Sequence, residues 1–238
     1  MTMKEKIVLI TGANKGIGLG MAEKLGKMGA HIIMVCRNEE KGKKALEHIK
    51  KENINASLYI ADIGSTDSIE KLHDEVSKDY DKIDVLVNNA GVSLGEGPAT
   101  TETTDLEKLR KTMDINFIGT FWMCKKFTHM VKKSDSGRII NFSSGLGQLT
   151  VPRMGGMPAY SSSKTAVNAI TKILADELKD TPVIVASVDP GWVRTDLGSD
   201  AAPLSIEEGI DTPVWLASAD ASEITTGEMY KERKIIGW

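Results

Sequence analysis

Tyr160 and Lys164 are four positions apart and could together move a proton to or from a substrate. A free tyrosine has a pKa near ~10 and is a poor acid or base at neutral pH. If the segment is helical, the Lys164 ammonium lies one turn along on the same face and favours the phenolate. Pro158 suits the first helical position, so the positive end of the helix dipole also acts on Tyr160. The pair predicts a general acid or base of lowered pKa, with a surface tyrosine beside a solvated lysine as the alternative.

A glycine-rich turn, Thr11-Gly12-Ala13-Asn14-Lys15-Gly16-Ile17-Gly18, follows the first apolar run. Gly12 permits a sharp turn out of a strand, Gly16 lets the backbone approach a pyrophosphate, and Gly18 lets the next helix pack closely on the sheet. The amino terminus of that helix adds N–H donors and a positive dipole for phosphate groups. The turn therefore predicts a dinucleotide site, and a glycine-rich turn that binds no ligand is the alternative.

The end of the second predicted strand decides between the two nicotinamide dinucleotides. An NAD site usually places a carboxylate about 20 residues beyond the glycines, where it binds the ribose 2′-hydroxyl. Here Arg37 follows Cys36 instead, and Lys15 lies in the glycine turn. A planar guanidinium binds two phosphate oxygens at once. We therefore expect NADP(H) rather than NAD, with Arg37 and Lys15 near the 2′-phosphate. A surface arginine that caps the next helix is the alternative.

Short apolar runs alternate with amphipathic stretches along the chain. Strands are predicted at 6–10, 31–36, 56–61, 83–87, 137–142 and 183–188, with a weaker one near 228–230. Helices are predicted at 16–28, 39–51, 67–79, 104–133 (as two helices), 158–179 and 206–217. This alternation is typical of a parallel sheet covered on both faces. Residues 1–238 are therefore predicted to form a single α/β domain, a Rossmann-type doubly wound parallel sheet flanked by helices on both faces.

Two long loops interrupt this alternation, at 145–158 and 191–205. Both follow predicted strands, so in an open α/β sheet they lie at the carboxyl ends of the strands, where ligands bind. Met154, Met157 and Trp192 lie in these loops and are candidates for substrate contact, with ordinary loop packing as the alternative.

Composition narrows the class of protein further. The 238 residues are 41% hydrophobic and 26% charged with a net charge of −3, and no basic run is dense enough for nucleic acid. No apolar run is long enough for a signal peptide or a membrane span. Cys36 and Cys124 lie in apolar settings and are expected to be buried free thiols, which favours a reducing, cytoplasmic location. The four histidines lack metal-ligand spacing, so no metal is expected.

Together these motifs resemble the classical subgroup of the short-chain dehydrogenase/reductase family, over nearly the whole stretch from Thr11 to about Asp196. The segments 37–42 and 190–196 are most similar to carbonyl reductase members. The matching pieces occur in the family's order: the glycine turn at 11–18, Asp62, Asn88-Asn89-Ala90-Gly91, Asn116, Ser143-Ser144, Tyr160 with Lys164, and Pro190-Gly191 with Thr195.

The resemblance implies a role for each catalytic candidate. Tyr160 would donate a proton to a carbonyl oxygen in reduction, or remove one from an alcohol in oxidation. Lys164 would lower the pKa of Tyr160 and hold the nicotinamide ribose. Ser144 would bind the substrate oxygen, and it is preferred to Ser143 because the family's serine is normally the second of such a pair. Asn116 would shape its helix and anchor a water that links Lys164 to solvent.

The resemblance also implies the cofactor contacts. Asp62 would contact the adenine edge, Asn88 would lie beside the adenosine ribose, and Thr195 would bind the carboxamide or a phosphate. A polar turn that merely ends a strand is the alternative for the segment at 88–91. The full set of expected NADP(H)-binding residues is Gly12, Asn14, Lys15, Gly16, Ile17, Gly18, Arg37, Asp62, Ile63, Asn88, Ala90, Gly91, Tyr160, Lys164, Pro190, Gly191, Val193 and Thr195.

These expectations combine into an NADP(H)-dependent carbonyl reductase that acts on a small-molecule carbonyl or alcohol, with an apolar aldehyde or ketone as the expected substrate. A non-catalytic NADP-sensing regulatory or scaffold protein is the alternative, but such relatives usually lack the catalytic tyrosine or lysine. A sugar-nucleotide epimerase is a second enzymatic alternative, but it is disfavoured because such chains carry a larger carboxyl-terminal substrate region. Family members commonly pair their long helices, so a homodimer or homotetramer is expected, with Phe121, Trp122 and Phe127 as interface candidates.

Overall fold

The predicted strands form one central sheet. The computed structural model describes residues 3–95, 99–151 and 156–238. Within these ranges, eight strands are ordered β3-β2-β1-β4-β5-β6-β7-β8. The strands are β1 (Ile7–Thr11), β2 (His31–Cys36), β3 (Ala56–Ile60), β4 (Val85–Asn88), β5 (Arg138–Phe142), β6 (Ile184–Val188), β7 (Glu228–Lys231) and β8 (Lys234–Ile236). Neighbours from β3 to β7 are parallel, and β8 runs antiparallel to β7. The strand order changes direction between β1 and β4, where ligands bind in such sheets.

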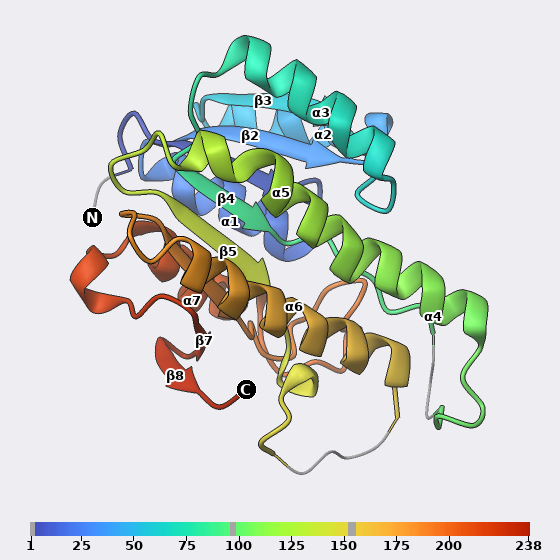
Figure 1. Ribbon diagram of the computed structural model, residues 1–238. Helices are drawn as coiled ribbons and strands as arrows, with labels where there is room; N and C mark the ends of the chain where they lie inside the picture. Colours follow the sequence, from blue (N-terminus) through green and yellow to red (C-terminus); the bar gives the residue numbers. More distant parts are fainter. Residues whose placement is uncertain (1–2, 96–98, 152–155) are drawn as a thin grey trace.

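Helices cover both faces of this sheet (Figure 1). One face packs against α1 (Gly16–Lys27), α2 (Glu39–Lys51) and α7 (Ile206–Ser218). The other packs against α3 (Thr66–Asp79), α5 (Gly119–Val131) and α6 (Pro158–Glu177). Side chains alternate between the faces, so Val8 and Ile10 join the first core and Leu9 joins the second. The predicted fold class, a doubly wound parallel sheet with helices on both faces, is confirmed.

The predicted pair of helices at 104–133 is more continuous than expected. The helix α4 (Leu106–Met113) leads directly into a π-helical turn at Asp114–Ile118, and α5 follows at once, so that the three form one long column in Figure 1. Single π turns inside helices are frequent at functional sites. This turn carries Asn116, whose place in the site is described below.

Three aromatic residues expected at a subunit interface have different environments. Phe127 is fully buried in the core, and the Trp122 indole donates a hydrogen bond to Glu70 of α3. Phe121 is 37% exposed. Packing within the chain therefore accounts for Phe127 and Trp122, and Phe121 stays an interface candidate.

Two further expectations about the chain meet the structure. Cys36 and Cys124 are buried free thiols, as predicted. None of the helices formed by residues 3–95, 99–151 and 156–238 is long and apolar enough to cross a membrane.

Candidate active site

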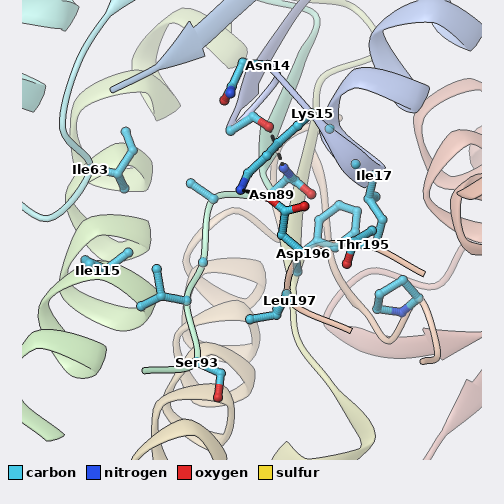
Figure 2. Close-up of a pocket in the computed structure, with 18 of the residues that line it drawn as sticks. Asn14, Lys15, Ile17, Ile63, Asn89, Ser93, Ile115, Thr195, Asp196 and Leu197 are labelled. Carbon is cyan, nitrogen blue, oxygen red and sulfur yellow. Dashed lines mark hydrogen bonds and ion pairs between the residues drawn. The ribbon is translucent and has the colours of Figure 1, made fainter. Parts of the chain in front are cut away.

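A cavity of about 920 Å³ opens at the carboxyl ends of the parallel strands. Its walls come from the glycine turn, the ends of β2 to β5, the first turns of α6 and the loop after β6 (Figure 2). The volume lies within the usual range for small-molecule and cofactor sites. Fifteen of the predicted site residues line it: Gly12, Asn14, Lys15, Gly16, Ile17, Gly18, Arg37, Asp62, Ile63, Ala90, Gly91, Tyr160, Lys164, Pro190 and Thr195.

The glycine turn has the backbone shape that its sequence predicts. Gly12 and Gly16 have φ angles of +68° and +54°, which side chains disfavour. A Cβ at Gly18 would lie 2.4 Å from the carbonyl oxygen of Gly12, so Gly18 serves close packing within the turn itself as well as the start of α1. That helix has no side-chain cap and no acidic residue in its first turn. Its positive end is therefore suited to receive a phosphate.

The structure turns Asn88 away from the cavity. The Asn88 amide donates to Asn141 on β5 at 2.8 Å and to the Cys124 thiol at 3.4 Å, and its side chain is buried within the sheet layer. Its neighbour Asn89, which belongs to the same motif but was not among the expected cofactor-binding residues, lines the cavity and donates to the Thr11 carbonyl oxygen at 2.8 Å. Asn88 is paired in the β4–β5 ladder, so its side chain faces α5 and not the cofactor side.

Gly191 and Val193 also lie outside the lining. Val193 is 3% exposed and packs against α7, where a Cβ at Gly209 would meet it at 2.5 Å. Gly191 has a φ of +78° and turns the chain beneath Leu204. These two residues shape the loop that carries Thr195. They do not line the cavity, so the structure does not support their predicted contact with the cofactor.

Two cations line the end of the cavity near β2 and the glycine turn. The Arg37 guanidinium lies 3.8 Å from the Asp62 carboxylate, and the Lys15 ammonium lies 2.5 Å from Asp196. The cap of α2 is Asn38, whose side chain accepts a hydrogen bond from the backbone of Lys41, so helix capping does not account for Arg37. Exposed ion pairs of this kind are weak. Arg37 and Lys15 are therefore free to exchange these partners for a phosphate.

Tyr160 and Ser144 lie together where the fifth strand meets α6. The side chain of Ser144 hydrogen-bonds to Tyr160 and also accepts from the backbone of Leu146 at 3.2 Å. Ser143 donates instead to the backbone carbonyl of Lys164. Ser144 is therefore the serine beside the tyrosine hydroxyl, whereas Ser143 is the one that lines the cavity, and the role of Ser144 in binding the substrate oxygen stays a prediction.

The pKa of Tyr160 is shifted in the direction opposite to the prediction. Burial, with a further contribution from the Asp189 carboxylate, raises the pKa of Tyr160 to about 12, although the hydrogen bond with Ser144 lowers it. Lys164 is itself buried, and this lowers the pKa of its amine to about 8. The amine donates to the Phe142 carbonyl at 2.8 Å and lies 5.6 Å from the centre of the Tyr160 ring. The predicted lowering of the Tyr160 pKa was wrong because desolvation by burial is the largest effect on the phenol.

Asn116 does not line the cavity but hydrogen-bonds to residues in and next to the lining. Its amide donates to the Val92 carbonyl at 2.9 Å and to the Ser163 hydroxyl at 3.0 Å, while its oxygen accepts from the Val92 backbone at 2.8 Å. A Cβ at Gly91 would meet both Asn116 and the Lys164 amine within 3.4 Å. Asn116 thus fixes the loop after β4 against α6. The water that Asn116 was expected to anchor stays a prediction.

Of the three residues expected to contact the substrate, the structure describes Met157 and Trp192. Met154 lies outside the described residues. Met157 caps α6 with a φ of +55°, and Trp192 is 56% exposed with its indole donating to Gly198. Neither lines the cavity. Val92, Ser93, Leu94 and Leu197 also line the cavity, and the sequence did not single them out because they carry no chemical signature.

The family model of the short chain dehydrogenases matches residues 6–203. The chain therefore belongs to the short chain dehydrogenase family. It is 29% identical to carbonyl reductase [NADPH] 1 of Mus musculus with all of both chains covered, and 29% identical to (+)-neomenthol dehydrogenase of Arabidopsis thaliana with 97% of each covered.

Solved structures agree with this assignment. Carbonyl reductase Sniffer of D. melanogaster matches with a TM-score of 0.87 and 27% identity, over 99% of this chain and 100% of that one. A short chain dehydrogenase from Escherichia coli CFT073 complexed with NADPH matches with a TM-score of 0.86 and 26% identity, over 95% of this chain and 96% of that one.

Proposed function

We propose that this protein is an NADP(H)-dependent oxidoreductase that interconverts carbonyl and alcohol groups of small molecules, in the manner of the carbonyl reductases that it resembles. The observation that carries the proposal is the half-buried Tyr160, hydrogen-bonded to Ser144, in the wall of a cavity of about 920 Å³ that the glycine turn also lines. A nucleotide sensor would need the cavity but not this proton donor.

The cavity residues fit NADP(H). The open positive end of α1 and the backbone of the glycine turn would hold the pyrophosphate. Arg37 and Lys15 would hold the 2′-phosphate, since both line the cavity and pair with exposed carboxylates that a phosphate can replace. Asp62 and Lys164 would contact the adenosine end and the nicotinamide ribose, respectively. When bound, the nicotinamide supplies or accepts the hydride.

Tyr160 would supply the proton. A phenol with a pKa of about 12 is protonated at neutral pH, so it can donate to a carbonyl oxygen but cannot accept from an alcohol without first losing its proton. The Ser144 hydroxyl would stabilise the charge that develops on that oxygen. The amine of Lys164, with a pKa of about 8, could return a proton to the tyrosine after turnover.

Part of the cavity lining suggests the class of substrate. Val92, Leu94 and Leu197 contribute apolar side chains, and Ser93, Ser199 and Asp200 contribute polar groups. Apolar side chains beside a few polar groups favour an apolar ligand that is oriented by its carbonyl oxygen. We propose a small or medium-sized aldehyde or ketone.

We also propose that the protein works in the cytoplasm as a homodimer or homotetramer. The two buried free thiols support a reducing compartment. Ile118 and Phe121 leave apolar surface exposed on the α4–α5 column, and Ile173 does so on α6. Light scattering of the purified chain would give its mass in solution.

The test is turnover of a panel of aldehydes and ketones, followed by the absorbance of NADPH and of NADH. NADPH oxidation that disappears in Tyr160→Phe supports the proposal. Tyr59→Phe is the matched control, because the Tyr59 hydroxyl bonds Asp79 and lies outside the cavity wall. Tight NADPH binding without turnover on any member of the panel would point to the sensor, and full activity in Tyr160→Phe would refute the assigned proton donor.

A further inference from the structure

Asp189, directly after β6, is a buried carboxylate that the proposed mechanism does not use. Its residue is 5% exposed. One carboxylate oxygen accepts from the backbone N–H of Gly191 at 3.0 Å. The other lies 3.2 Å from the ammonium of Lys231 on β7. Burying a charge is costly unless it is paired and hydrogen-bonded, and both conditions are met here.

The same carboxylate lies against the turn that carries the predicted oxygen-binding serine. A Cβ at Gly145 would come 3.2 Å from the carboxylate oxygen that faces Lys231, so the backbone after Ser144 runs directly beside Asp189. Ser144 in turn hydrogen-bonds Tyr160. On its other side, Asp189 precedes Pro190, which lines the cavity.

We propose that Asp189, paired with Lys231, is a positioning residue that ties the Ser144–Gly145 turn, the Pro190–Gly191 turn and β7 into one rigid wall behind the reacting groups. The inference rests on the proposed function, since it assigns Ser144 and Tyr160 to the chemistry. Asp189 touches neither substrate nor cofactor in this role. It acts through the backbone of both turns and through its charge.

The charge of Asp189 gives the role a measurable signature. Among the residues that the structure describes, the charged groups shown near Tyr160 are Asp189 after β6 and Lys164 on α6, and the Ser144 hydroxyl is one of its hydrogen-bond partners. The negative charge of Asp189 raises the pKa of Tyr160. Because reduction needs the protonated phenol, activity falls as the pH rises through this pKa. Removing the charge therefore moves the alkaline fall in activity to lower pH.

The first experiment compares Asp189→Asn with Asp211→Asn. The asparagine keeps the shape and the acceptor for Gly191 but removes the charge. Asp211 is paired with Arg233 at the surface, so its variant makes the same change of charge away from the site. We expect kcat/KM for carbonyl reduction to fall about tenfold in Asp189→Asn, and its alkaline fall to begin at lower pH than in wild type. Unchanged kcat/KM and an unchanged pH profile would overturn the inference.

The second experiment does not depend on turnover. Urea unfolding of Asp189→Asn, Lys231→Met and the double variant forms a double-mutant cycle. We expect each single variant to lower the unfolding midpoint, Lys231→Met because it leaves a buried carboxylate unpaired, and the double variant to lose less than the sum. Additive losses would refute the proposed coupling between Asp189 and Lys231. If wild type reduces no carbonyl but the cycle shows coupling, the proposed function fails while the structural role of the Asp189–Lys231 pair stands.

Discussion

Lys15 and Asp196, separated by 181 positions in the chain, form an ion pair that joins two walls of the cavity. Their ammonium and carboxylate lie 2.5 Å apart, and Figure 2 shows the lysine reaching from the glycine turn to the loop after β6. The hydrogen bond and charge of Lys15, with a smaller contribution from Lys41 on α2, lower the pKa of Asp196, so the carboxylate faces the same cationic end of the site. A phosphate that binds Lys15 must compete with Asp196.

Asp196→Asn should therefore bind NADPH more tightly than wild type. Removing the competing carboxylate frees Lys15 and removes a repulsion toward phosphate, for which we expect a gain of about two- to fivefold in affinity, smaller at high salt. Fluorescence titration with NADPH at two ionic strengths measures it. Asp180→Asn, which changes an exposed acid just beyond the carboxyl end of α6, is the charge control. Weaker binding in Asp196→Asn would instead identify the pair as a latch that closes over the cofactor.

Arg37 should decide the choice between the two dinucleotides. Arg37→Ala removes a charge-assisted contact to the 2′-phosphate, so the KM for NADPH should rise about tenfold or more, while the KM for NADH stays close to the wild-type value. Steady-state kinetics with both cofactors give the ratio. Arg110→Ala removes a similarly exposed arginine from α4 and should leave the ratio unchanged. A parallel loss for NADH and NADPH would place Arg37 elsewhere on the cofactor.

Gly18→Ala should break the glycine turn. The new Cβ would lie 2.4 Å from the Gly12 carbonyl oxygen and 2.6 Å from the Asn89 amide, so the turn must shift. We expect a loss of about 1–3 kcal/mol in unfolding free energy together with a severe loss of NADPH affinity. Thermal unfolding with and without NADPH separates the two effects. Lys24→Ala, on the exposed face of the same helix, should preserve the stabilisation by NADPH, and its preservation in Gly18→Ala would refute the assigned role of the turn.

The sequence predicted the central strands well because each is a nearly continuous apolar run that is buried on both faces. It missed β8, a three-residue strand whose residues are largely exposed and which pairs with β7 alone. Choosing between Asn88 and Asn89 required the register of β4 against β5, because neighbouring residues of a strand point to opposite faces. The family resemblance of the segment at 88–91 does not give the strand register, so it could not distinguish the two asparagines.

The pKa of Tyr160 shows a second limit of local reasoning. The Tyr160–Lys164 spacing describes only one electrostatic attraction along a helix. Both residues line the cavity, which agrees with their expected place near the cofactor. The largest effect on the phenol is burial, followed by the hydrogen bond with Ser144, and the charge of Asp189 adds a smaller contribution from the end of a different strand. Desolvation depends on everything packed around the phenol, so it becomes visible only when the chain is folded.

The buried, protonated amine of Lys164 should lower the free energy of unfolding of the protein. Burial lowers the pKa of its amine from 10.5 to about 8. The unfolded chain therefore binds more protons between these two values, and stability rises with pH across that window. Below pH 8 the full cost is present, about 3 kcal/mol for a shift of this size. Lys164→Met should accordingly be more stable than wild type at pH 7, although inactive.

Urea unfolding of wild type and Lys164→Met at a series of pH values from 7 to 10.5 measures this cost. The advantage of the variant should shrink as the pH rises through 8 toward 10.5, because the wild-type amine loses its proton in both states. Lys179→Met makes the same change at an exposed position just beyond α6 and should show no such trend. A constant difference between Lys164→Met and wild type over the whole range would mean that packing, and not the buried charge, sets the stability at this position.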